Sequence, residues 1–197
     1  MLKVGLTGGI GTGKSTASKF FTALGAFIFD ADQKAKTLIN TNKKVQKELI
    51  NEFGTDILNI QQKIDKKKLA RIAFQDENHQ QRLNAVIHPY LYELIDAAFQ
   101  NISSKNKYSM FIVDGALIYE SGFDSHLDYV IVVTSQLKHR MERALNRGTL
   151  SREEILKRIE LQWTEEEKIG LADFVIHNDR TEKDLKKNVE QLFRELV

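Results

Sequence analysis

Eight consecutive residues near the start of the chain have the composition of a phosphate-binding loop. Residues 8–15 read Gly-Gly-Ile-Gly-Thr-Gly-Lys-Ser and match the pattern G-x-x-x-x-G-K-[ST]. Such a loop wraps phosphate oxygens in backbone N–H groups, so side chains must be absent where it closes, and the following helix adds its partial positive charge. Lys14 would reach the β and γ phosphates of a nucleotide, and Ser15 would ligate Mg²⁺. The alternative is a glycine-rich turn that only lets a strand and a helix pack closely.

Three carboxylates follow apolar segments of strand length. Asp114 follows the run Met110–Val113, where a carboxylate can face a bound metal through water; the other interpretation is a turn-starting Asp before a glycine. Asp30 and Asp32 follow the run Ala26–Phe29, at the edge where open α/β sheets bind ligands. A carboxylate there can take the proton of a phosphoryl-acceptor hydroxyl, whereas Asp32 as the N-cap of the next helix would be structural.

The phosphate-binding loop needs a strand before it and a helix after it. The apolar run Lys3–Thr7 precedes the glycines, and apolar residues then recur at helical spacing from Ala17 to Leu24, up to the helix stop Gly25. Further runs of strand length, separated by helical patterns, follow at Ala26–Phe29, Met110–Val113, Tyr129–Val133 and Phe174–Ile176. This alternation predicts an α/β fold in which a parallel sheet is covered by helices on both faces.

The second and third strands are separated by about seventy residues, too many for one crossover helix. Helical periodicity there predicts an inserted helical subdomain, with helices around Val45–Phe53, Leu69–Phe74 and Leu83–Phe99. The lysines of this stretch, Lys63 and Lys66–Lys68, could face a substrate diphosphate, but a solvated helix start is favoured. Later in the chain, two capping boxes predict two helix starts, Ser151 with Glu154 and Thr164 with Glu167. The two helices are expected to meet near Trp163, which should pack the lid helix against the core.

Composition limits the class of protein. The 197 residues are 42% hydrophobic and 28% charged, which suits one full core with a small insert. A net charge of +2 gives no strong attraction to nucleic acid or membranes, and the absence of cysteine excludes disulfides and thiolate metal sites. The histidines at 79, 126, 139 and 177 lack metal-ligand spacing. No apolar stretch of signal-peptide or transmembrane length is present, so a soluble cytoplasmic protein is expected.

With these residues in place, nearly the whole chain resembles the dephospho-CoA kinase family. The matching segments are residues 6–16, Asp30-Ala31-Asp32, His88-Pro89, Gln162 with Lys168, and Ala172-Asp173 with Asn178. The resemblance implies a P-loop NTPase fold with a five-stranded parallel sheet in the order 2-3-1-4-5. It also implies one domain, 1–197, comprising a nucleotide-binding core (1–32, 103–136 and 166–197), a helical substrate domain (33–102) and a helical lid (137–165).

The resemblance also implies a reaction, the transfer of the ATP γ-phosphoryl group to the 3′-hydroxyl of dephospho-CoA. Asp32 matches the family's proposed base, His88 a substrate-side residue, and Arg143 and Arg147 two lid arginines, although spacing of four also suits a solvated helix face. Mg²⁺ would be held by Ser15 and, through water, by Asp114. The nucleotide would contact Gly9, Gly11, Thr12, Gly13, Lys14, Ser15, Thr16 and Asn178. The expected partner is the small-molecule substrate alone, without nucleic acid or membrane, and the expected state is a monomer or a weak homo-oligomer.

Two departures from the family pattern stand out. After the third-strand Asp the family usually has a proline, a hydrophobic pair and Phe-Glu, whereas this chain reads Asp114-Gly115-Ala116-Leu117-Ile118-Tyr119-Glu120. Arg140 stands where the family often has Gln. A related nucleoside or nucleotide kinase would share the loop, the sheet and the lid but lack the Asp-Ala-Asp segment and the His-Pro pair. A nucleotide-hydrolysing switch is disfavoured, because no guanine-reading N-K-x-D occurs and lid arginines in cis suit transfer with water excluded.

Overall fold

The computed structural model describes all 197 residues, which form two compact units. The core unit comprises Met1–Asp30 and Ala97–Val197, and the insert unit comprises Ala31–Asp96. The long helix α5, Glu77–Ser103, belongs to both units. The family resemblance implies an insert of residues 33–102, whereas the insert unit ends at Asp96, so the last turns of α5 lie in the core unit.

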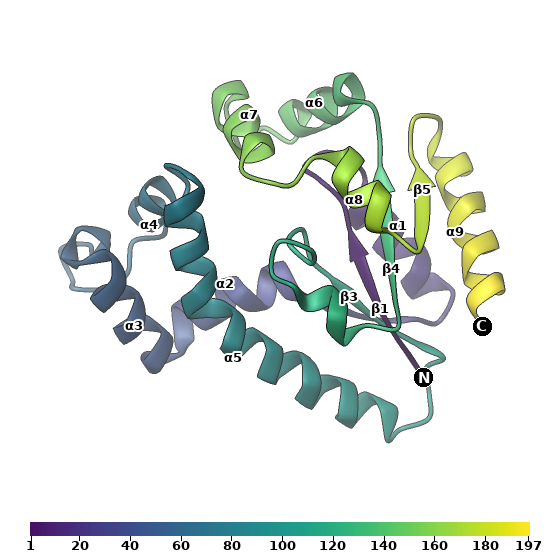
Figure 1. Ribbon diagram of the computed structural model, residues 1–197, viewed down its shortest axis with the longest axis horizontal. Coiled ribbons are helices and arrows are strands. Elements are labelled where there is room, and N and C mark those ends of the chain that lie inside the picture. Colours follow the sequence, from purple (N-terminus) through teal and green to yellow (C-terminus); the bar gives the residue numbers. More distant parts are fainter. The chain divides into compact units, whose positions relative to one another are not determined.

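Five parallel strands form the sheet of the core unit, in the order β2-β3-β1-β4-β5 (Figure 1). They are β1 (Leu2–Thr7), β2 (Phe27–Asp30), β3 (Met110–Asp114), β4 (Tyr129–Thr134) and β5 (Phe174–His177). The predicted fold class, strand positions and strand order are confirmed. Because every pair is parallel, the carboxyl ends of all five strands meet at one edge, and Asp30 at the end of β2 is in register with Asp114 at the end of β3.

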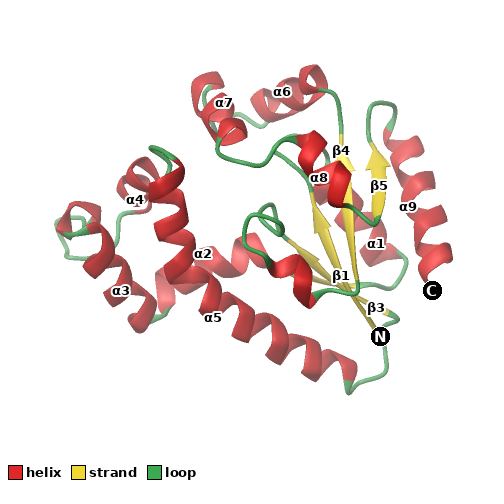
Figure 2. Ribbon diagram, viewed as in Figure 1, coloured by secondary structure: helices red, strands yellow, loops and turns green.

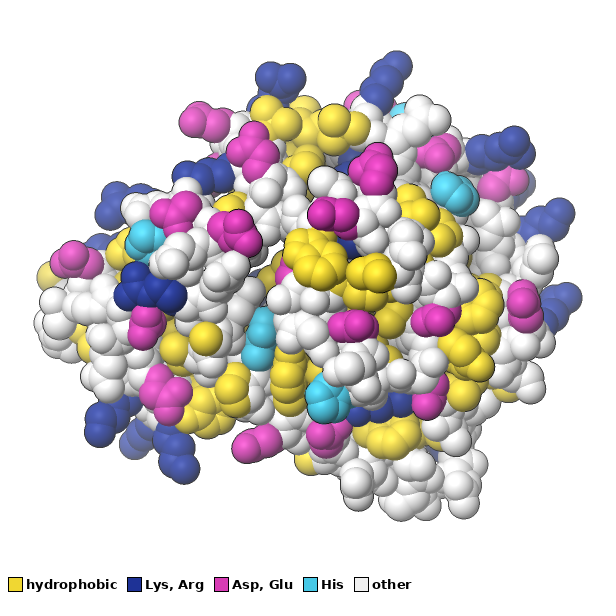
Figure 3. Space-filling model, in the orientation of Figure 1, with side chains coloured by type: hydrophobic (Ala, Val, Ile, Leu, Met, Phe, Trp, Pro, Cys, Tyr) yellow, Lys and Arg dark blue, Asp and Glu magenta, His cyan; other side chains and the backbone are white.

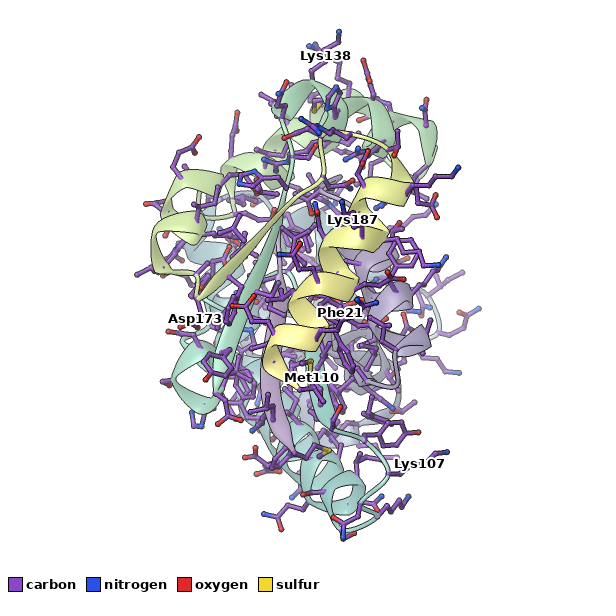
Figure 4. All side chains as sticks on the ribbon, turned by 90° about the vertical axis from the view of Figure 1, so that its right-hand side faces the viewer. Phe21, Lys107, Met110, Lys138, Asp173 and Lys187 are labelled. Atoms are coloured by element: carbon purple, nitrogen blue, oxygen red, sulfur yellow. The ribbon has the colours of Figure 1, made fainter.

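The central strands are buried on both faces, which explains their continuous apolar sequences. All five residues of β3 are buried, and so are the last five of β4. On one face, helices α1 (Lys14–Ala23) and α9 (Glu182–Leu196) pack together over the sheet, and Phe21 lies beneath α9 with its ring centroid 6.5 Å from that of Phe193 (Figure 4). On the other face, Val130 and Val132 pack with Ile118 and with Ile169 of α8 (Glu165–Leu171).

Helices α6 (Leu137–Asn146) and α7 (Arg152–Glu160) connect β4 to α8 (Figure 2). Both predicted capping boxes are present. The Ser151 hydroxyl accepts the amide of Glu154, whose carboxylate accepts the amide of Ser151, and Thr164 and Glu167 repeat this exchange at the start of α8. The starts of α7 and α8 are therefore fixed by local sequence.

The insert unit is mainly helical, with one antiparallel β-bridge between Leu58 and Ile64. Its helices are α2 (Ala31–Thr41), α3 (Lys43–Phe53), the 3₁₀ helix η1 (Thr55–Ile57), α4 (Lys66–Ala73) and most of α5. The three predicted helices are confirmed, and each begins earlier than its apolar pattern indicates. Side-chain caps account for two of these starts, because Asn42 accepts the amides of Lys44 and Val45 and Asp65 accepts those of Lys67 and Lys68. Lys66–Lys68 are exposed at the start of α4, as expected for a solvated helix start.

Charge is distributed without a dominant sign over the face of the molecule in Figure 3, where basic and acidic side chains are interspersed. This pattern agrees with a net charge of +2. No helix is both long enough and apolar enough to cross a membrane.

Candidate active site

The glycine-rich loop connects β1 to α1 at the carboxyl edge of the sheet, as the sequence predicts. Its shape depends on glycine: Gly13, immediately before α1, has a φ of 99°, and a Cβ there would overlap the side-chain amide of Asn178. That amide donates to the carbonyl oxygen of Thr12 at 2.8 Å. Asn178, which the family resemblance assigns to the nucleotide, thus braces the loop from the end of β5.

Several polar groups of the loop have no partner within the protein. No protein group accepts the amides of Gly11, Gly13 and Ser15, and the buried hydroxyl of Thr12 makes no hydrogen bond. A buried N–H or O–H donor without an acceptor destabilises the folded protein unless a ligand supplies the acceptor. Three open amides at the start of a helix fit the oxygens of a phosphate group.

Lys14 and Asp114 are paired. The Lys14 ammonium donates to one carboxylate oxygen of Asp114, and the hydroxyl of Ser18 donates to the other. Asp114 therefore does not start a turn with its side chain; it holds the loop lysine at the end of β3. No group of three or more His, Asp or Glu side chains is arranged to hold a metal ion by itself.

A cleft of about 430 Å³ lies beside the loop. Arg143 and Arg147, from the end of α6, line it together with Gly13, Thr16 and Asn178. Arg143 is anchored, since it donates to the hydroxyl of Ser135 at 3.1 Å and to the carbonyl oxygen of Asn178 at 2.8 Å. Arg147 is exposed and makes no hydrogen bond or ion pair with the protein. The structure thus brings both predicted lid arginines to one cleft with the loop.

Comparison with known proteins agrees with this geometry. A family model described as dephospho-CoA kinase matches residues 2–184. The chain belongs to the dephospho-CoA kinase family. The dephospho-CoA kinase of Fusobacterium nucleatum is 38% identical over 188 residues, which cover 95% of each chain. Among solved structures, a protein of Thermus thermophilus superimposes with a TM-score of 0.81 at 29% identity, covering 100% of this chain and 98% of its own. The dephospho-CoA kinase of Campylobacter jejuni has a TM-score of 0.68 at 29% identity, covering 98% and 96%.

The two substrate-side residues that the family resemblance assigns both lie in the insert unit. Helix α2 begins at Ala31, so Asp32 lies in its first turn, two residues beyond the carboxyl end of β2, and the N-cap interpretation is wrong. His88 lies within α5 and stacks on Tyr92 with centroids 5.7 Å apart. Burial lowers the pKa of His88 to about 4, so its imidazole is neutral at pH 7.

The segment in which this chain departs from the dephospho-CoA kinase pattern is held by a buried lysine. Lys168 of α8 is fully buried; its ammonium donates to the carbonyl oxygen of Ala116 at 3.1 Å and pairs with Glu120 at 2.8 Å. The hydroxyl of Tyr119, at the position where the resemblance leads us to expect Phe, is buried without a partner, and burial raises its pKa to about 12. Trp163 stacks on the buried Tyr119 ring, with centroids 6.2 Å apart, but the residue is 41% exposed, so it packs on the core with one face only.

The sequence singles out Arg140 and Gln162 but does not place them, or Glu165, against the first half of the loop. Arg140, Gln162 and Glu165 all bind the backbone of Gly9 or Ile10. The Thr164 capping box predicts where α8 starts, and so that Glu165 is in its first turn, but nothing in the local sequence indicates that this turn faces the loop.

Proposed function

We propose that this protein transfers the γ-phosphoryl group of ATP to the 3′-hydroxyl of dephospho-CoA, giving CoA and ADP. The supporting observation is the glycine-rich loop, with its open amides and Lys14, in a chain that belongs to the dephospho-CoA kinase family. The bond between the γ-phosphorus and the ADP oxygen breaks, a bond from phosphorus to the 3′-oxygen forms, and the hydroxyl proton leaves to a base.

The loop holds the phosphates of the nucleotide. The amides of Gly11, Gly13 and Ser15 have no competing acceptor, so binding a phosphate requires no internal hydrogen bond to break. Lys14 is held by Asp114 at the same edge, and it exchanges this carboxylate for phosphate oxygens when a nucleotide binds.

A magnesium ion fits this arrangement only together with the nucleotide. The protein offers one hydroxyl, from Ser15, and one nearby carboxylate, Asp114, which would reach the ion through water. These two groups suit Mg²⁺, because this ion is ordinarily bound by one or two carboxylates plus substrate phosphates. When bound, the ion would neutralise charge on the phosphates. Ser15 would hold the ion directly, and Asp114 would hold it through water.

Asp32 is the proposed base for the 3′-hydroxyl. It lies two residues beyond the carboxyl end of β2, and open parallel sheets usually bind their ligands at the carboxyl ends of their strands. His88, which is neutral at pH 7, can accept or donate one hydrogen bond to the substrate but cannot supply a charge. Arg143 and Arg147 provide the guanidinium groups that steady charge on the transferring phosphoryl group.

A substrate competition tests this function. The purified protein is incubated with ATP and Mg²⁺ and offered dephospho-CoA, AMP, UMP or adenosine, and ADP release is measured. We expect release with dephospho-CoA to exceed release with each of the others. A preference for AMP, UMP or adenosine would replace the proposal with another nucleoside or nucleotide kinase.

A further inference from the structure

Arg140 and Glu165 form a buried ion pair directly against the phosphate loop. Nη1 of Arg140, in the first turn of α6, lies 3.3 Å from Oε1 of Glu165, in the first turn of α8, and the two side chains are 7% and 11% exposed. A pair this deeply buried loses most of its hydration, so its stability depends on further hydrogen bonds. Those further bonds are made to the loop.

Each residue of the pair makes a hydrogen bond to the loop backbone, Glu165 to Gly9 and Arg140 to Ile10. The amide of Gly9 donates to Oε1 of Glu165 at 3.1 Å, and Nε of Arg140 donates to the carbonyl oxygen of Ile10 at 3.0 Å. Gln162 adds a third contact, because its Oε1 accepts the amide of Ile10 at 3.3 Å. Side chains thus bind the amides of Gly9 and Ile10 and the carbonyl of Ile10, whereas the amides that face a phosphate are open.

The close contact of Arg140 and Glu165 with the loop explains why two of its residues, Gly9 and Gly11, are glycines. A Cβ at Gly9 would overlap the Arg140 guanidinium and come within 2.5 Å of the Glu165 carboxylate, and a Cβ at Gly11 would overlap the backbone of Arg140. Glycine at these two positions lets the start of α6 lie against the loop. The helix that carries Arg143 and Arg147 therefore contacts the phosphate loop directly.

Glu165 also connects this contact to the sheet. Its second oxygen accepts the hydroxyl of Thr134, the last residue of β4, at 2.7 Å. The single carboxylate thus links β4, the loop, α6 and α8. Both oxygens have protein donors, so the carboxylate has no part in proton transfer and acts through what it holds.

We propose that Arg140 and Glu165 are positioning residues for phosphoryl transfer: together they set the conformation of the Gly9–Ile10 half of the loop and hold α6, with Arg143 and Arg147, against it. This inference rests on nucleotide binding by the loop and deepens the proposed function. Removing one charge of the pair leaves the other buried without a counter-charge beside the loop, whereas removing both leaves amide side chains that can still accept from Gly9 and donate to Ile10.

The test is a double-mutant cycle with Glu165→Gln, Arg140→Gln and the double variant, and with exposed Glu166→Gln as the matched control. ADP affinity is measured by calorimetry without an acceptor, and kcat and both KM values follow from the full assay. We expect each single variant to weaken ADP binding about 10-fold and to leave the KM for dephospho-CoA within about 2-fold. The double variant should recover to within about 3-fold of the wild-type affinity.

Two outcomes would overturn the proposal. If the single variants lower the melting temperature but leave ADP affinity and kcat unchanged, the pair is a structural ion pair only. If the losses of the single variants multiply in the double variant, the residues act independently. A single variant that does not fold is replaced by the double variant and by Arg140→Lys, which keeps the charge. Because ADP binding needs no acceptor, the result stands even if the assay with dephospho-CoA fails.

Discussion

The ammonium group of Lys14 donates to Oδ1 of Asp114, while the Ser18 hydroxyl donates to Oδ2 of the same carboxylate. The two ion-paired side chains are 13% and 10% exposed. The lysine of the phosphate loop is therefore oriented by the last residue of β3, which lies one strand away from β1 in the sheet. The charge that a nucleotide needs is already in place at the edge of the sheet and is balanced there by one carboxylate.

Replacing Lys14 by Ala should abolish most turnover without unfolding the protein. It also lowers the free energy of unfolding, because the buried Asp114 carboxylate keeps the Ser18 hydroxyl but loses its cation. The change removes the cation that faces the phosphates but little packing, and losing one electrostatic stabiliser of a transition state costs about 10²–10³ in kcat. Steady-state assays measure the loss, and circular dichroism checks the fold. Lys19→Ala, on the exposed side of the same helix, is the control and should be fully active. An active Lys14→Ala protein would remove the phosphate-loop assignment.

Asp32→Asn should lower kcat by about 10²–10⁴ with ATP affinity nearly unchanged, because the amide cannot accept the hydroxyl proton. Asp56→Asn makes the same change at an exposed carboxylate of the insert unit and should have no effect. ATP affinity is measured by calorimetry and kcat by ADP release. If Asp32→Asn loses ATP binding instead, or keeps full activity, the aspartate has a structural role.

The two arginines of the cleft should respond differently to substitution. Arg143 donates two hydrogen bonds inside the protein, so Arg143→Ala should lower both kcat and the free energy of unfolding, the latter by about 1–3 kcal/mol. Arg147 has no protein partner, so Arg147→Ala should lower kcat with unchanged stability. Urea unfolding and steady-state kinetics of both variants, with exposed Arg152→Ala as the control, separate the two effects. Equal stability losses at 143 and 147 would contradict this difference.

Local sequence was sufficient for the strands, the loop and the starts of α7 and α8, because each depends on residues close together in the chain. The run Met110–Val113 is apolar since both faces are covered, and Thr164 with Glu167 caps a helix without help from elsewhere. The hydrogen bonds of Arg140 and Glu165 to the loop could not be predicted. The bonded residues are 130 and 156 positions apart in the sequence, and their contact depends on how α6 and α8 pack. The same holds for Trp163, whose half-exposure follows from the position of Tyr119.

Lys168→Ala should destabilise the protein strongly, by about 3–5 kcal/mol, because it leaves the Glu120 carboxylate buried without its cation. One oxygen of Glu120 is already buried without a partner, so the remaining charge has little compensation. Lys157→Ala, at an exposed lysine of α7, should change stability by less than about 0.5 kcal/mol. Urea unfolding measures both. A small decrease in the free energy of unfolding for Lys168→Ala would contradict this prediction, because it would mean that the attraction within the pair does little more than offset its desolvation cost. In that case the double variant Lys168→Ala/Glu120→Gln should be as stable as Lys168→Ala alone.

Stability should fall with acid below pH 6.5 in a way that depends on His88. Burial lowers its folded-state pKa from 6.5 to about 4, so between these values the unfolded chain binds more protons than the native protein. The free energy of unfolding therefore decreases as the pH falls through this window, by about 1–2 kcal/mol between pH 7.5 and pH 5 from this residue alone. His88→Gln cannot take up the proton, so the gap between wild type and variant should narrow by that amount at pH 5. Urea unfolding at both pH values measures the gap, and His177→Gln, at an exposed strand end, is the matched control. The same pH dependence in wild type and His88→Gln would show that the imidazole is not held neutral by burial.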